Sequence, residues 1–518
     1  MRTSFLIVSC VLIGAASTAA AQTTAAQCSG LTKLQVPGFS VEITKADWIA
    51  VAAGAPAPAG AGPRGAQTPH CRIDGVIDRR VGAGNRPYGI GFALALPENW
   101  NGRFFFQGGG GLNGNVGNPV GTQATGNATA LSRGFAVVST DTGHTGTAFD
   151  GAFMQDQQAA LDFAFVAIGR VAVLAKQIIA QHYGRPAEKS YYVGCSTGGR
   201  EAMVMAQRYP TYFDGIISGA PAMRTGYSNL ATRSVAVALN QAAPKDASGQ
   251  PLPAQIFSDS DKQTIIDGLA NACDDKDGLK DGLIFNTRGC TFDPKVLACS
   301  GAKKDGCLSA PQVSALAKAF AGPRDSKGRE VYPPFPWDTG ITATGGGIPG
   351  LLSPGNSPLG PPNRSLQQDV DAEAVQQAMN AQAVIGDTYT WTNLSTFSSR
   401  GGKLLFYHGV SDPWFSANDT IDYYTRLGAA NGGADRVQTW SRLFLSPGMG
   451  HCQGGQSLDT FDLLTALVDW VEKGVAPASV TATGRAFPGR SRPLCAYPTS
   501  ATYKGSGDPE SAASFECR

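Results

Sequence analysis

Charged residues are scarce in this chain of 518 residues. Asp, Glu, Lys and Arg together make up 16% of it, and the formal net charge is +2. Proteins that bind nucleic acid or an anionic membrane surface normally carry a clear basic excess. We therefore expect no nucleic-acid partner. The hydrophobic fraction of 42% is sufficient for a sizeable core.

Long hydrophobic runs are equally scarce. The run over residues 5–13 is followed by Ala19-Ala20-Ala21, an A-x-A cleavage pattern. This predicts a signal peptide over residues 1–21 and a mature protein that is secreted or periplasmic. The alternative, a lipoprotein signal ending at Cys10, leaves a shorter apolar region than such signals need. No later run reaches the roughly 18 apolar residues of a membrane span, so we expect none.

The cysteines are few but even in number once the signal peptide is removed. Eleven occur in the chain, and ten remain without Cys10. In an exported protein this favours disulfides over metal or redox thiols. Spacing alone does not fix the pairing, although close neighbours suggest four pairs and leave Cys195 and Cys452. The suggested pairs are Cys28–Cys71, Cys273–Cys290, Cys299–Cys307 and Cys495–Cys517.

The most informative stretch covers residues 191–208. Two tyrosines and a valine predict a short buried strand, the glycines a tight turn, and residues 201–208 a helix. Gly194-x-Ser196-x-Gly198 in this setting is a nucleophile elbow, which exposes the Ser196 hydroxyl at the end of a strand. The alternative is a chance match in a chain with 65 glycines, but the strand and helix on either side favour the elbow.

Strand and helix patterns alternate on both sides of this motif, which predicts an α/β fold with a parallel sheet covered on both faces. Residues 22–75 have an irregular pattern. Between residues 223 and 399 the strand signals fade, and Pro, Gly and Asp accumulate. We therefore expect an α/β-hydrolase core from residues 22–222 and 400–518, with residues 223–399 as an inserted lid domain. Strands are predicted over residues 89–96, 103–107, 134–139, 215–221, 403–409 and 442–445, and helices over about 161–183 and 460–473.

A run of four glycines, residues 108–111, follows the strand predicted over 103–107. Glycines at this place let the backbone approach a substrate and donate an N–H to an oxyanion. We expect the N–H groups of Thr197 and of Gly110, or of a neighbour in this glycine run, to form this oxyanion hole. The alternative is a flexible turn without a function.

A serine nucleophile needs a base that a carboxylate orients. In the order Ser, Asp, His, only His408 and His451 follow Ser196. His408 ends a predicted strand before any suitable acid, whereas His451 lies in a Gly-rich loop. Asp412 follows a strand end, so we predict the triad Ser196–Asp412–His451. The alternatives are a buried structural histidine and a turn aspartate.

The Asp141 and His144 side chains precede the serine and are interpreted as bracing groups of a loop. A further acidic loop, residues 274–283, combines closely spaced carboxylates with glycines that let the chain curl, as oxygen-liganded Ca²⁺ requires. The alternative is a solvated acidic turn. We expect a structural Ca²⁺, with Cys273 and Cys290 flanking its loop. The expected ligands are the carboxylates of Asp274, Asp277 and Asp281 and the backbone carbonyls of Leu279 and Leu283.

These motifs together resemble the tannase and feruloyl esterase family of secreted α/β-hydrolases. The resemblance rests on Gly194-Cys195-Ser196-Thr197-Gly198-Gly199, Thr140-Asp141-Thr142-Gly143-His144, the acidic loop, His408-Gly409-Val410-Ser411-Asp412 and Pro447-Gly448-Met449-Gly450-His451-Cys452. It implies the same triad, a Cys195–Cys452 disulfide and a Ca²⁺ in the lid. Such a disulfide would keep the Ser196 and His451 segments adjacent.

The resemblance also bears on the substrate. Phe415 matches an aromatic residue that lines the pocket in family members acting on mono(2-hydroxyethyl) terephthalate. Those members hold the substrate carboxylate with an arginine after a Trp-rich lid segment, but residues 345–366 are Gly/Pro-rich here, with Arg364 as their one basic residue. We therefore expect hydrolysis of aromatic acyl esters of the feruloyl or galloyl type. The alternatives are a terephthalate monoester hydrolase that uses Arg364 and a non-catalytic binding module.

Overall fold

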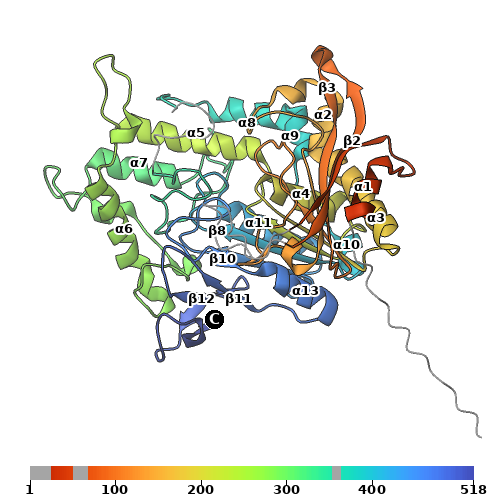
Figure 1. Ribbon diagram of the computed structural model, residues 1–518. Coiled ribbons are helices and arrows are strands. Elements are labelled where there is room, and N and C mark those ends of the chain that lie inside the picture. Colours follow the sequence, from red (N-terminus) through yellow and green to blue (C-terminus); the bar gives the residue numbers. More distant parts are fainter. Residues whose placement is uncertain (1–24, 51–67, 353–362) are drawn as a thin grey trace, which may run out of the picture.

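The computed structural model describes residues 25–50, 68–352 and 363–518 (Figure 1). The signal peptide predicted over residues 1–21 lies outside these ranges. The protein is built around a nine-stranded mixed sheet of order β1-β2-β3-β5-β4-β6-β7-β8-β9. Its strands are β1 (Val41–Ile49), β2 (His70–Val81), β3 (Pro87–Pro97), β4 (Arg103–Gln107), β5 (Ala136–Thr140), β6 (Lys189–Cys195), β7 (Gly215–Gly219), β8 (Lys403–Gly409) and β9 (Ser441–Ser446).

The sheet has a parallel part of six strands and an antiparallel part of three. Strands β5, β4, β6, β7, β8 and β9 pair in parallel, as the alternation of strands and helices predicted. In β4, Phe104, Phe105 and Phe106 are all buried, as a strand covered on both faces requires. Strands β1, β2 and β3 pair antiparallel with one another, and β3 pairs antiparallel with β5.

The prediction that residues 22–75 are irregular was wrong for the described residues of this segment, which exclude 22–24 and 51–67. Strand β1 and the first part of β2 lie in this segment, and the two strands pair over eight positions, from Val41 with Ile77 to Ile49 with His70. In β2, Cys71, Ile73 and Ile77 are buried at alternate positions of one face. Arg72 and Asp74 alternate with them on the other face, which is the period of two of a half-buried strand.

Helices cover both faces of the sheet. Side chains of α3 (Ala167–Tyr183), α4 (Thr197–Arg208) and α11 (Ala417–Ala430) pack in one core cluster, and α13 (Leu463–Lys473) packs in another. Neighbouring strand residues divide between the two, because Tyr192 joins the first cluster and Tyr191 the second. Two small sheets complete the C-terminal part: β10 (Thr460–Phe461), β11 (Ser479–Thr483) and β12 (Ser491–Cys495), and β13 (Ala501–Tyr503) with β14 (Phe515–Cys517).

Two predicted helices differ from those observed. The helix expected over about 161–183 comprises α2 (Gln157–Leu161), a π-helical turn and α3. Helix α13 starts at Leu463 rather than Thr460, because Asp462 caps it and residues 460–461 form β10. The stretch Gln157–Tyr183 is long and apolar enough to cross a membrane by length and composition alone. It packs in the core of this protein, and core helices of soluble proteins pass the same test.

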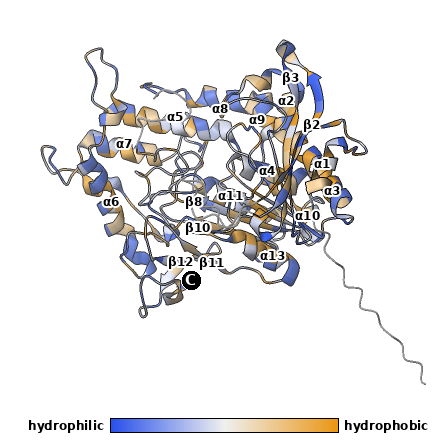
Figure 2. Ribbon diagram, in the orientation of Figure 1, coloured by the Kyte–Doolittle hydropathy of each residue, from blue (hydrophilic) through white to orange (hydrophobic). Residues whose placement is uncertain are grey.

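The chain between β7 and β8 forms an insertion, residues 220–402, whose described part adds no strand to the main sheet. It has a hydrophobic cluster of its own, which includes Leu239, Leu269 and Leu316. Helices α5 and α7 carry both hydrophilic and hydrophobic colours in Figure 2, as helices that bury one face do. The helices of the insertion are α5 (Thr225–Ala242), α6 (Asp259–Cys273), α7 (Ala310–Phe320), α8 (Val370–Met379), α9 (Ala381–Gly386) and α10 (Ser395–Ser399).

Five disulfides tie the described chain together. Four of them are the pairs that the spacing suggested, Cys28–Cys71, Cys273–Cys290, Cys299–Cys307 and Cys495–Cys517. The fifth joins Cys195 to Cys452. Five disulfides point to an extracellular or otherwise oxidising compartment.

Two short helices complete the helices of the described residues. They are α1 (Ala25–Gly30) and α12 (Ala434–Val437).

Candidate active site

Ser196 occupies a sharp turn between β6 and α4. Its φ of 63° and ψ of −123° lie in a region that non-glycine residues rarely adopt. The turn is tight because a Cβ on Gly194 would collide with the carbonyl of Gly198. Ser196 is 8% exposed, and that exposure faces a cavity.

A buried acid–base pair lies at the ends of the next strands. His451 Nδ1 is 2.7 Å from Asp412 Oδ2. The other oxygen, Oδ1, accepts the N–H groups of Trp414 (2.9 Å) and Phe415 (3.1 Å). Burial alone would raise the pKa of Asp412, but the charges and hydrogen bonds of the two nearby histidines hold it below its ordinary value. Asp412 therefore stays ionised beside His451.

His408 also contacts Asp412 but differs from His451 in its surroundings. Its Nε2 lies 3.4 Å from Asp412 Oδ2 and 2.9 Å from the carbonyl of Phe415, and its Nδ1 lies 2.8 Å from Thr420 Oγ1. It is completely buried and lines neither of the cavities described below. Both ring nitrogens are thus engaged in holding the loop after β8.

Two cavities meet at Ser196. The larger, of about 970 Å³, is lined by Ser196, His451 and the glycines 109–111. The smaller, of about 460 Å³, is lined by Ser196, Thr197 and aromatic residues that include Trp414 and Phe415. No hydrogen bond joins the Ser196 hydroxyl to His451 in the described chain; such contacts are often long before substrate binds.

The Cys195–Cys452 disulfide connects the turn that holds Ser196 to the loop that holds His451. Its Cα atoms are 6.0 Å apart, across a sequence separation of 257 residues. Because each cysteine is the direct neighbour of Ser196 or His451, the bond limits how far the two residues can separate. The disulfide therefore restrains the distance between Ser196 and His451 and also cross-links two distant parts of the chain.

The expected oxyanion donors lie on the cavity walls. Thr197 is the first residue of α4, so its N–H has no partner within the helix. Gly110 lines the larger cavity, and a Cβ built on it would meet nothing within 4 Å. The neighbouring Gly109 carbonyl accepts the N–H of Gly198 at 3.1 Å, which holds the glycine loop against the start of α4.

Asp338 is a residue of the insertion that the sequence did not single out. It is 0% exposed. Its Oδ2 accepts the Ser411 hydroxyl and the Gly448 N–H, each at 2.6 Å. Ser411 precedes Asp412, and Gly448 lies three residues before His451. One carboxylate from the insertion therefore joins the acid loop to the histidine loop.

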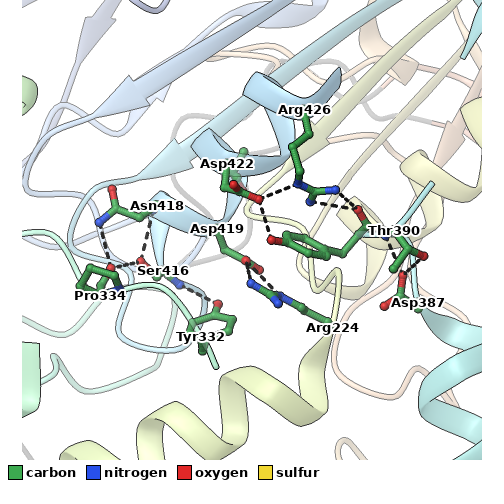
Figure 3. A network of polar contacts seen from close by, with 12 residues as sticks. Arg224, Tyr332, Pro334, Asp387, Thr390, Ser416, Asn418, Asp419, Asp422 and Arg426 are labelled. Carbon is green, nitrogen blue, oxygen red and sulfur yellow. Dashed lines mark hydrogen bonds and ion pairs between the residues drawn. The ribbon is translucent and has the colours of Figure 1, made fainter. Parts of the chain in front are cut away.

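A polar network also holds the insertion against the segment after Asp412 (Figure 3). Arg224 Nε donates to Asp419 Oδ1 at 3.0 Å, and the Ser416 hydroxyl donates to the carbonyl of Pro334 at 2.7 Å. The Ser416 N–H donates to Tyr332 Oη at 3.1 Å. These contacts fix the start of α11 and with it Trp414 and Phe415, the aromatic wall of the smaller cavity.

The two candidate substrate residues have different positions. Phe415 stacks on Trp414 at 5.0 Å between ring centres and lines the smaller cavity. Arg364 pairs with Asp246 at 3.7 Å, with half of its side chain exposed, and lines neither cavity at Ser196. The structure therefore does not bring Arg364 to the site. Trp414, which lines both cavities, lacked any motif that marked it in the sequence.

The loop residues Asp141 and His144 lie apart from the triad. Asp141 Oδ1 accepts the N–H groups of Gly91 (2.9 Å) and Gly143 (2.8 Å), and burial raises its pKa to about 7. The His144 ring stacks on Phe153 at 3.6 Å, and burial lowers its pKa to about 4. Both side chains brace the loop after β5, whose Phe149 lies beside Gly111.

The acidic loop has features that fit a cation. Asp274 and Asp277 are buried, and Asp274 Oδ1 has no hydrogen-bond partner. Burial raises the pKa of Asp277 to about 7, and Asp281 and Asp274 add to that effect. The Asp281 carboxylate pairs with Arg492. No three His, Cys, Asp or Glu side chains in the described ranges are grouped closely enough to hold a metal, so a site here needs backbone carbonyls such as those of Leu279 and Leu283.

Comparison with known proteins agrees with this architecture. The family model described as tannase and feruloyl esterase matches residues 71–382 and 362–518. Mono(2-hydroxyethyl) terephthalate hydrolase of Piscinibacter sakaiensis is 39% identical over 86% of this chain and 84% of its own length. A probable feruloyl esterase of Arthroderma benhamiae is 32% identical over 82% of this chain and 81% of its own.

Solved structures extend the comparison to the fold. Feruloyl esterase B of Aspergillus oryzae superposes with a TM-score of 0.74 at 26% identity, covering 95% of this chain and 100% of its own. Tannin acyl hydrolase of Aspergillus niger gives a TM-score of 0.72 at 21% identity, over 96% and 94% of the two chains, and supports the fold alone. The family model covers well over half of the sequence, and the mixed sheet is that of an α/β-hydrolase. The chain therefore belongs to the tannase and feruloyl esterase family and is a carboxylic ester hydrolase.

Proposed function

We propose that this protein is an exported serine esterase that cleaves esters of aromatic acids, of the feruloyl or galloyl type, through an acyl-enzyme. Ser196 attacks the ester carbonyl, and His451 takes the serine proton and later passes it to the leaving alcohol. Asp412 orients the imidazole and stabilises its charged form. The N–H groups of Gly110 and Thr197 stabilise the oxyanion, a contribution of roughly 3–4 kcal/mol per donor.

The observation that carries this proposal is the Asp412–His451 hydrogen bond beside a strained serine in one cavity. The 2.7 Å contact sets His451 Nδ1 as the partner of the acid and leaves Nε2 for the serine. The Cys195–Cys452 bond keeps the serine and the base together. Neither a structural histidine nor a turn aspartate accounts for this arrangement.

The side on which His451 lies gives the orientation of the ester. Because His451 protonates the leaving oxygen, the alcohol part leaves on the side of the larger cavity, which His451 lines and the smaller cavity lacks. The acyl part then occupies the smaller cavity between Phe415, Trp414 and Phe149. Stacked aromatic walls favour a planar aromatic acid.

The test is product release from a panel of esters by the mature protein and by Ser196→Ala. The panel contains methyl ferulate, methyl gallate, ethyl benzoate and mono(2-hydroxyethyl) terephthalate. We expect preference for the neutral phenolic esters and loss of turnover in Ser196→Ala by more than about 10,000-fold. A protein that binds these esters without cleaving them would be the binding module that the sequence left open.

A second candidate is hydrolysis of mono(2-hydroxyethyl) terephthalate. It is favoured by the 39% identity to the Piscinibacter sakaiensis enzyme of that name. Against it stands the place of Arg364, which pairs with Asp246 away from both cavities. Preference for the terephthalate monoester in the panel would select this candidate.

We infer the roles of the insertion and of a cation from the same structure. Residues 223–399 act as a lid domain on the core of residues 22–222 and 400–518, since Gly346, Gly347 and Ile348 line the larger cavity. A structural Ca²⁺ in the acidic loop would take the Asp274 and Asp277 carboxylates and the backbone carbonyls of Leu279 and Leu283 as ligands, because the Asp281 carboxylate pairs with Arg492. The unpartnered oxygen of Asp274 supports this. The export signal over residues 1–21 and five disulfides support a secreted or periplasmic location.

A further inference from the structure

A buried glutamate lies behind the glycine loop. Glu201 is the fifth residue of α4, five residues after Ser196, and its side chain is 0% exposed. The nucleophile motif ends at Gly198 and assigns Glu201 no role. A carboxylate is costly to bury unless hydrogen bonds compensate for its lost hydration, so its partners show what the position requires.

The carboxylate of Glu201 accepts three hydrogen bonds. Oε2 accepts the N–H of Gly109 at 3.0 Å and the Tyr192 hydroxyl at 2.7 Å, and Oε1 accepts Asn113 Nδ2 at 2.7 Å. Burial and the nearby Glu201 raise the pKa of Tyr192 well above its ordinary value, so Tyr192 remains a donor. No ion pair involves Glu201 in the described ranges, and the adjacent Arg200 donates to backbone carbonyls instead.

These bonds fix the backbone around Gly109 from both sides. Glu201 holds the N–H of Gly109, and the N–H of Gly198 holds its carbonyl at 3.1 Å. The Gly109 carbonyl and the Gly110 N–H belong to the same peptide group. This peptide is planar and trans, so the Gly110 N–H points in the direction opposite to the Gly109 carbonyl. Fixing Gly109 therefore fixes the direction of the Gly110 N–H.

We propose that Glu201 is the positioning residue of the oxyanion hole. It acts through the Gly109 backbone on the Gly110 N–H and does not touch the substrate. This inference rests on the proposed function, because an oxyanion forms only when Ser196 attacks an ester. Preorganised donors are effective only when they meet the oxyanion at hydrogen-bond distance, and α4 carries both Glu201 and the second donor, Thr197. One helix thus sets both donors relative to each other.

Two variants of Glu201 separate the effect of its side-chain length from the effect of its charge. In Glu201→Gln, the amide oxygen can replace Oε2, and the amide nitrogen replaces Oε1. The side-chain amide of Asn113 can then rotate by about half a turn. Its Oδ1, which is buried without a partner, would accept a hydrogen bond from the new amide nitrogen of the Glu201→Gln variant. In Glu201→Asp the charge stays, but the side chain is one methylene too short to reach Gly109.

The expected result is that Glu201→Gln keeps kcat within about threefold, whereas Glu201→Asp lowers kcat by about 10- to 100-fold with KM nearly unchanged. An arylboronic acid, which adds to Ser196 as a tetrahedral anion, should bind Glu201→Asp more weakly by a similar factor. Tyr192→Phe is the control, since it removes a partner of the same Oε2 without touching Gly109. It should lower Tm without changing kcat.

The outcome that overturns the inference is equal behaviour of the Gln and Asp variants. Full kcat in Glu201→Asp, or unchanged boronic acid affinity in it, also overturns the inference. A loss in Tyr192→Phe that matches that in Glu201→Asp would make the effect one of stability and overturn it too. Failure of the proposed function is distinct, because the wild-type protein would then cleave no ester at all.

Discussion

The sheet and the insertion contribute to the same cavity by different means. Ser196 follows β6 directly, Asp412 lies three residues after β8, and His451 five residues after β9. Since β6, β7, β8 and β9 are parallel neighbours, their carboxyl ends meet at one edge. The insertion supplies walls and one bracing carboxylate, Asp338, from segments without strands. The sheet therefore sets the chemistry, and the insertion supports and covers it.

The largest expected effect tests which histidine at the sheet edge is the base. His451→Ala should lower kcat/KM by about 10,000-fold or more, because the serine loses its proton acceptor. His408→Gln should lower it by at most about tenfold, since His408 contacts Asp412 but neither cavity. Steady-state kinetics on the preferred phenolic ester measures both. Equal losses would contradict the assignment of His451.

The next effect compares a disulfide of the sheet edge with one of the insertion. Removing Cys195–Cys452 by double serine substitution should lower both Tm and kcat, because it frees the nucleophile and histidine loops. Removing Cys299–Cys307 should lower Tm alone. A disulfide stabilises the fold by lowering the entropy of the unfolded chain, and this effect grows with the sequence separation of the two cysteines. With separations of 257 and 8 residues, it should be roughly twice as large for Cys195–Cys452 as for Cys299–Cys307. Thermal melts and kinetics of both variants decide this, and unchanged kcat without the first disulfide would refute it.

The pH dependence of stability sharpens the account of the loop that braces the sheet edge. Burial raises the pKa of Asp141 to about 7 from 3.8. The folded state then keeps a proton that the unfolded state loses, so the free energy of unfolding should fall as pH rises from about 4 to about 7. A pKa that rises from 3.8 to about 7 on folding changes the free energy of unfolding by at most roughly 4 kcal/mol over this pH range.

Asp141→Asn should remove the contribution of Asp141 to this slope. Asp277 and Asp162, whose pKa values burial raises to about 7 and about 6, should account for part of what remains. Chemical denaturation at pH 5 and 7.5 measures the difference between variant and wild type. The same slope in both proteins would show that Asp141 does not titrate as described.

Removing Ca²⁺ tests the stability of the insertion separately from the sheet. EDTA should lower Tm, because a ligand present at a hundredfold excess over its Kd stabilises the folded state by about 2.7 kcal/mol. Re-addition of Ca²⁺ should restore Tm, and Asp274→Asn should respond to neither. A melt that EDTA leaves unchanged, with no calcium found by elemental analysis, would exclude the site.

The smallest effect tests the link between the two regions. Asp338→Asn should lower kcat by about tenfold, because the amide cannot accept from both Ser411 and Gly448 and bond Thr339 as well. Asp325→Asn is a matched control in the insertion, since Asp325 also accepts backbone N–H groups but lies on a local turn. Its kcat should not change. Similar kcat values for both variants would show that the insertion does not brace the triad.

The difference between the sheet and the insertion also explains which features could be predicted from the sequence. The proposed triad residues follow from the order of strands and from the elbow, which are patterns that can be read along the chain. Asp338 escaped prediction because its partners Ser411 and Gly448 lie 73 and 110 residues away. The place of Arg364, away from Ser196, likewise depends on how the insertion packs. In the N-terminal segment, β2 shows the alternation of buried and exposed residues that is typical of a half-buried strand, so this strand could have been predicted.

The most direct test of the central claim is covalent labelling of the active serine. An aryl phosphonate that mimics the tetrahedral intermediate should add once to the wild-type protein, on the peptide that contains Ser196, as shown by mass spectrometry. Ser196→Ala should not react, and His451→Ala should react far more slowly. Labelling at another residue, or no labelling of a protein that cleaves esters, would contradict the account.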